Sequence, residues 1–149
     1  MKHFLGFLAV LFAAAMTHGQ LANPQPEVPA FHATRPLAAT KLPPILTEKQ
    51  LADQGMIAPA QKESYKAAAR ASSVVYQMPC YCYCDRNHGH TSLRSCFEGT
   101  HAAVCETCLQ EVFYAEQQSK RGWSIKMIRD AIERGDFKMI DLRKASLTH

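Results

Sequence analysis

The sequence predicts a mainly α-helical fold, a small domain of about four helices with an irregular cysteine-rich segment between the second and third helices. Two observations carry this prediction. Helix start and stop residues flank apolar stripes of helical period in the second half of the chain. All six cysteines fall between residues 80 and 108, and no such stripe precedes residue 102 in that segment.

The first two expected helices begin at residues that favour helix starts. Thr47 is followed three residues later by Gln50, which matches a capping box, and the short helix that they open ends at Gly55. Pro59 is a favoured first-turn residue, because its missing N–H would have no partner there. The alanine-rich run at 60–75 then predicts the body of the second helix.

The third and fourth helices have the clearest apolar stripes. A helix over about 102–120 places valine, cysteine and alanine side chains on one stripe, with Cys105, Leu109 and Phe113 beside it, and Gly122 suits its end. Ser124 caps the fourth helix, which Gly135 stops. The apolar residues of 137–142 predict a short extended piece that closes the core. A core of this size is marginal without disulfides or a metal.

The ends of the chain predict export. Residues 1–19 have a basic start, an apolar run at 4–16 and small residues at a cleavage position, which is typical of a signal peptide. The apolar run is too short for a good membrane span. Residues 20–46 hold six prolines and predict a linker, followed by a Cys/His-rich domain at 47–142 and a tail at 143–149. We therefore expect a periplasmic or extracellular protein with no membrane span after signal removal.

The charge of the chain excludes some classes of partner. Its net charge is +4, and removal of residues 1–19 leaves 16 Lys and Arg residues against 13 Asp and Glu residues, or +3. This mild value without a long basic run does not indicate a nucleic-acid partner. A metal ion is the expected partner, together with an envelope protein as an open possibility.

Cys80, Cys82 and Cys84 alternate with two tyrosines after Pro79. Proline and tyrosine favour extended backbone, in which alternate side chains share one face. Neighbouring Cα atoms on that face are about 6.5–7 Å apart, at or beyond the usual disulfide span. Adjacent members of the three are therefore poor disulfide partners, and are well placed to share an ion or to reach separate partners.

Cys105 and Cys108 are expected side by side in the first turn of the third helix. The free N–H groups and the partial positive charge at a helix start favour thiolate, the form that binds metals. His101 lies four residues before Cys105, while His90 and Cys96 lie between the two cysteine groups. His88 is expected to be a turn residue instead of a ligand.

Folding of the loop would bring these thiols and imidazoles together. The candidate metal ligands are Cys80, Cys82, Cys84, Cys96, Cys105, Cys108, His90 and His101. They could serve one tetrahedral site, two sites or a cluster of monovalent copper bridged by thiolates. Three disulfides in a small secreted domain are the competing interpretation, and a mixed state is a further one. The spacing alone leaves these alternatives open.

The run from Pro79 to Cys84, Pro-Cys-Tyr-Cys-Tyr-Cys, resembles the signature of the bacterial PCYCGC-motif family. The similarity continues at Cys96-Phe97 and at His101-x-x-x-Cys105-x-x-Cys108, and spans roughly residues 42–142. The resemblance implies an exported protein, in some members a lipoprotein, and it implies no biochemical activity. Tyr83 stands where the family name has glycine, which favours the extended form of the motif over a tight turn.

Three functions follow from these observations. The first is an exported protein that sequesters or transfers a soft metal ion, copper first and zinc second, with no enzymatic activity. The second is a disulfide-stapled structural or interaction domain of the cell envelope. The third is a thiol oxidoreductase that uses Cys105 and Cys108, although no strand–helix–strand pattern precedes them. No catalytic triad, paired-carboxylate site or phosphate-binding glycine loop is recognisable.

Overall fold

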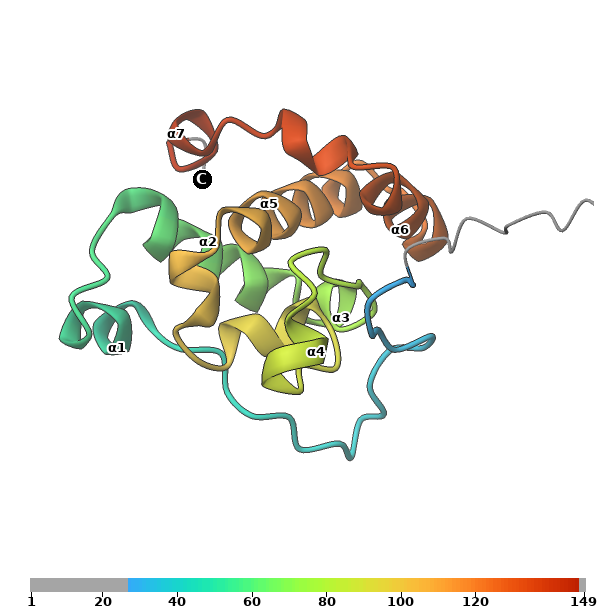
Figure 1. Ribbon diagram of the computed structural model, residues 1–149, viewed down its shortest axis with the longest axis horizontal. Coiled ribbons are helices and arrows are strands. Elements are labelled where there is room, and N and C mark those ends of the chain that lie inside the picture. Colours follow the sequence, from blue (N-terminus) through green and yellow to red (C-terminus); the bar gives the residue numbers. More distant parts are fainter. Residues whose placement is uncertain (1–26, 148–149) are drawn as a thin grey trace, which may run out of the picture.

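A computed structural model describes residues 27–147, and within this range the protein is mainly helical and has no strands (Figure 1). The α-helices are α1 (Glu48–Asp53), α2 (Pro59–Arg70), α3 (Ser72–Val75), α4 (Cys84–His88), α5 (Glu106–Lys120), α6 (Ile125–Glu133) and α7 (Leu142–Ala145). Three 3-10 helices join them: η1 (Leu93–Phe97), η2 (His101–Val104) and η3 (Asp136–Met139). The mainly α prediction is confirmed, but the described chain has more helices than the four expected.

The longest helix, α5, forms the centre of the domain, and α2 packs along it (Figure 1). Tyr65 of α2 meets Phe97 of η1 edge to face at 4.9 Å, and both rings are buried with Phe113 of α5. An ion pair also links the two helices, because Arg70 Nε donates to Glu116 Oε1 at 2.5 Å and Arg70 Nη2 to Glu63 Oε1 at 2.8 Å. This packing holds α5 as the support for the cysteine-rich segment.

The expected helix caps are present at three positions. Thr47 and Gln50 form the predicted capping box of α1, Pro59 is the first residue of α2, and the Ser124 hydroxyl accepts a hydrogen bond from the amide of Met127 in α6. Gly135, which follows the C-cap Arg134 of α6, adopts a φ of 83°, a conformation that glycine tolerates without steric cost.

Other helix boundaries differ from the predictions. The second predicted helix is interrupted at Ala71, so that α3 is separate, and Arg94 Nε donates to the Ser72 hydroxyl at this break. The third begins at Glu106, not near residue 102, because Cys105 has extended backbone and the preceding residues form η2. A short apolar stripe cannot distinguish an α-helical turn from a 3-10 turn.

The extended piece expected at 137–142 is a further correction. Residues Asp136–Met139 form η3, and Leu142–Ala145 form α7, whose first amides are capped by the Asp141 side chain at the amide of Arg143. Phe137 is buried, as a core-closing residue should be. Ile140 and Leu142 are partly buried against the core, but Met139 is 76% exposed. The apolar pattern therefore identified the core contacts of this segment only in part, and its conformation wrongly.

The proline-rich residues 27–46 contain no helix and run along the surface of the domain. The amide of Ala30 donates to Asp85 Oδ2 at 3.0 Å, and His32 stacks on Tyr76 with a centroid distance of 3.9 Å. The predicted signal peptide, the first residues of the predicted linker and the last two of the predicted tail lie outside the described residues. None of the helices within 27–147 is both long enough and apolar enough to cross a membrane.

Candidate metal centre

The motif Pro79–Cys84 folds as a tight turn that leads into α4. The amide of Tyr83 donates to the carbonyl of Cys80 at 3.0 Å, and Tyr83 adopts a φ of 56°, the left-handed conformation. Cys84 is the first residue of α4. The extended form predicted for this run is therefore wrong, and Tyr83 occupies a backbone position that glycine adopts without strain.

Two hydrogen bonds attach this turn to the rest of the domain. The amide of Leu93 donates to the carbonyl of Met78 at 2.9 Å, which closes the loop before η1. The amide of Tyr81 donates to Glu111 Oε1 on α5 at 2.8 Å. Glu111 is 0% exposed, and burial raises the pKa of its carboxyl well above the usual range. This positioning residue was not singled out in the sequence, although its spacing of three from Cys108 places it on the same helix face.

The six cysteines, which we call the sulfur cluster, come from four parts of the fold. Cys80 and Cys82 lie on the turn, Cys84 begins α4 and Cys96 lies in η1. Cys105 is the N-cap of α5, and Cys108 lies in the first turn of that helix, as predicted. Four members are buried and two, Cys82 and Cys105, are partly exposed.

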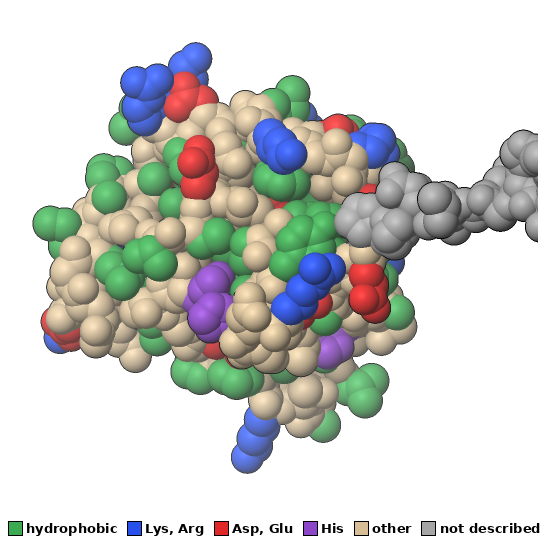
Figure 2. Space-filling view, in the orientation of Figure 1, with side chains coloured by type: hydrophobic (Ala, Val, Ile, Leu, Met, Phe, Trp, Pro, Cys, Tyr) green, Lys and Arg blue, Asp and Glu red, His purple; other side chains and the backbone are tan. Residues whose placement is uncertain are grey.

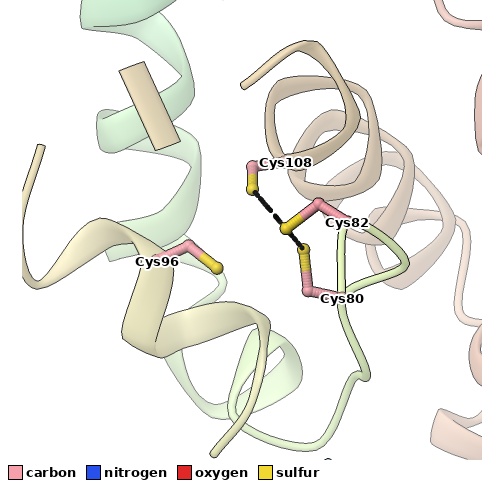
Figure 3. Close-up of side chains that lie close together, drawn as sticks. All are labelled: Cys80, Cys82, Cys96 and Cys108. Carbon is pink, nitrogen blue, oxygen red and sulfur yellow. Dashed lines mark hydrogen bonds between the residues drawn. The ribbon is translucent and has the colours of Figure 1, made fainter. Parts of the chain in front are cut away.

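The sulfur atoms of Cys80, Cys82 and Cys108 form a triangle, with Sγ–Sγ distances of 3.4, 3.5 and 3.7 Å. Figure 3 shows these three side chains pointing toward one another from the turn and from α5, with Cys96 directed toward them from η1. A second close pair is formed by Cys84 and Cys96, whose sulfurs are 3.3 Å apart. Within the motif, Cys80 and Cys82 therefore share Cys108 as a neighbour, whereas Cys84 pairs with Cys96.

Three sets of four ligand atoms lie close enough to hold an ion, with all atoms of a set within 4.8 Å of one another. The sets are Cys80–Cys82–Cys96–Cys108, Cys82–Cys84–Cys96–His101 and Cys82–His101–Cys105–Cys108. Cys82 belongs to all three sets. The predicted candidates are thus brought together, except that His90 belongs to none of these sets.

Imidazoles border the sulfur cluster on one side. His101 Nε2 lies 3.5 Å from Cys82 Sγ, and His90 Nδ1 lies 3.3 Å from Cys96 Sγ. The ring of His88 is centred 4.8 Å from that of His101 and 5.7 Å from that of His90. His88, expected only as a turn residue, thus completes a group of three histidines around the sulfurs.

The pKa values of the clustered thiols are shifted in opposite directions. Hydrogen bonds with Cys105 and Cys108 lower the pKa of Cys82, and hydrogen bonds with Cys108 and Cys80 lower the pKa of Cys96 to about 4. The pKa of Cys80 is raised, first by its interaction with Cys108 and then by that with Cys82. Sulfurs this close cannot all carry negative charge without a cation, so full ionisation of the cluster requires one.

The structure also bears on the competing interpretations of the cysteines. All six are free thiols, so none of the disulfides of the stapled-domain hypothesis is present. No strand occurs within residues 27–147, so Cys105 and Cys108 do not lie in a strand–helix–strand unit there. The described residues bring together thiols, which are soft ligands, and imidazoles, which are borderline ones. This set suits a soft metal ion.

Fold and site together define a small helical protein with a partly buried cysteine and histidine cluster. The chain belongs to the family described as proteins of unknown function with a PCYCGC motif, which it matches over residues 38–138. This confirms the resemblance seen in the motif. Neither a search of curated proteins nor a search of solved structures found a match.

Proposed function

We propose that this protein is an exported binding protein for a soft metal ion, copper first and zinc second, which it sequesters or transfers as cargo. The observation that carries the proposal is the sharing of ligands between the three sets of four. Cys82 belongs to every set, while Cys96, Cys108 and His101 each belong to two. A thiolate that belongs to more than one set is suited to bridge two metal ions.

Monovalent copper fits this arrangement better than zinc does. Zinc in a structural site takes four ligands in a closed tetrahedron, which one set such as Cys80–Cys82–Cys96–Cys108 would supply. That single site would leave Cys84 and Cys105 without a role. Soft thiolates favour monovalent copper, and bridging sulfurs would allow more than one ion to use all six cysteines.

Burial and charge support the same proposal. Four of the six cysteines are buried, which shields bound monovalent copper from oxidants and competing ligands. The start of α5 lies at the cluster, where its free amides and partial positive charge favour the thiolate form. Export would place such a protein where copper meets the cell envelope.

A competition titration tests the choice of metal. Reduced protein is titrated without oxygen with monovalent copper held by a chromophoric chelator, and separately with zinc. We expect more than one copper ion per chain and at most one zinc ion, with copper displacing zinc. If the fully reduced protein binds no copper, the proposal is contradicted. If it binds one zinc ion that copper does not displace or add to, the site is a structural zinc site.

A further inference from the structure

We propose that His88, His90 and His101, the histidine trio, form a second and outer metal site through which the ion passes to the sulfur cluster. This inference rests on the proposed function and adds the route by which the cargo is received. The three rings lie in mutual contact range, with centroid distances of 4.8, 5.1 and 5.7 Å.

The trio lies nearer to solvent than the buried sulfurs of Cys84 and Cys96 do. His88 is exposed, and His90 and His101 are partly buried, whereas Cys84 is 3% exposed and Cys96 is 0% exposed. Histidine side chains reach the surface on the face drawn in Figure 2. An ion held by the imidazoles would therefore lie nearer to solvent than the buried thiols.

Two members of the trio already touch the sulfur cluster. His101 Nε2 is 3.5 Å from Cys82 Sγ, and His90 Nδ1 is 3.3 Å from Cys96 Sγ. Both thiols belong to sets of four ligand atoms close enough to hold an ion, so each is an acceptor at the inner end of the route. His88, the exposed member of the trio, contacts the other two rings.

Ligand strength gives the route a direction. Neutral imidazole binds monovalent copper, but thiolates bind this soft ion more strongly. An ion would therefore exchange an imidazole for Cys82 or Cys96, and each further thiol that binds would release its proton to solvent. A cavity of about 520 Å³ borders His90, and it gives room for the ligands of an incoming copper complex.

The alternative route leads through Cys105, which is also partly exposed and belongs to only one set of four. The two routes differ in whether they need His88. An ion received at Cys105 would reach Cys108 and Cys82 directly, so that loss of the His88 ring would leave its arrival unchanged.

The test is the rate of copper transfer from a Cu(I)–bicinchoninate complex to reduced protein, followed by loss of the chelate absorption in a stopped-flow instrument. We expect His88→Ala to slow transfer about ten-fold, while the final number of ions per chain stays that of the wild type. Asn87→Ala, the neighbouring change on α4, should transfer at the wild-type rate.

Each other outcome has a separate meaning. An unchanged rate in His88→Ala would overturn the route through the trio and favour Cys105. A reduced final number of ions would overturn the outer-site role, because His88 would then be a permanent ligand. Failure of the wild-type protein to take any copper from the chelate would count against the proposed function itself.

Discussion

Tyr83 donates its backbone amide to the carbonyl of Cys80 at 3.0 Å while it holds a φ of 56°. This one turn sets where the first three cysteines point, since it separates Cys80 and Cys82 from Cys84 at the start of α4. The family motif has glycine at this position, and the turn gives a physical reason for that glycine. The tyrosine ring instead contacts Arg86, whose guanidinium carbon lies 4.2 Å from the ring centroid.

The first prediction concerns the left-handed residue. We expect Tyr83→Gly to be more stable than Tyr83→Ala by about 1 kcal/mol, because only glycine avoids the steric cost of a positive φ. Both variants lose the ring contact with Arg86, so their difference isolates the backbone. Equilibrium unfolding in urea of the reduced proteins measures it. As a control, Asn87→Gly and Asn87→Ala, inside α4, should show the opposite order of stability, since alanine favours a helix. A Tyr83→Ala variant more stable than Tyr83→Gly would contradict the left-handed turn.

The second prediction concerns the attachment of the turn to α5. Glu111→Leu removes the acceptor of the Tyr81 amide, and we expect a loss of about 1–3 kcal/mol in the free energy of unfolding. Glu111→Gln retains an acceptor oxygen and should lose less. A loss of copper affinity should accompany Glu111→Leu, because the turn carries two members of the sulfur cluster. Equal stability of the two variants would show that this hydrogen bond does not hold the turn.

The third prediction ranks the cysteines. Cys82 belongs to all three sets of four ligands, and Cys105 belongs to one. We therefore expect Cys82→Ser to lose most of the bound copper, and Cys105→Ser to lose the smaller share. Anaerobic titration with metal analysis after gel filtration gives both numbers, and circular dichroism checks that the helices remain. The reverse order would contradict the shared role of Cys82.

The fourth prediction concerns pH. The raised pKa of Cys80 keeps it protonated at neutral pH, and it must lose its proton to bind an ion. Protons therefore compete with copper, so the apparent affinity should fall as the pH is lowered. A further fall is expected near pH 4, where Cys96 takes up a proton. Competition titrations at several pH values, corrected for the chelator's own protonation, measure this trend, and an affinity independent of pH would be the contrary result.

Several helices could be predicted because their signals are local. Thr47 and Gln50 form a capping box across one turn, and Ser124 caps α6 through the amide of Met127. The turn at Tyr83 could not be predicted in this way. Its positive φ occurs together with distant contacts, such as that between Tyr81 and Glu111, thirty residues along the chain. Tyrosine also favours extended backbone, so its local preference indicated the wrong conformation.

The candidate ligands could be recognised from residue type, whereas their grouping depended on the fold. The closeness of Cys105 and Cys108 follows from helix spacing. The pairing of Cys84 with Cys96 requires α4 and η1, and neither element had a stripe to indicate it. His88 joined the site for the same reason, because α4 directs it toward His101.

The most direct test of the central claim is made on the protein purified without oxygen from the cells that produce it. Metal content by mass spectrometry and the number of alkylatable thiols are measured on the same sample. We expect bound copper together with four or more free thiols after the metal is removed, and loss of that copper in the Cys105→Ser/Cys108→Ser variant. Absence of metal together with absence of free thiols would contradict the account and identify a disulfide-stapled domain.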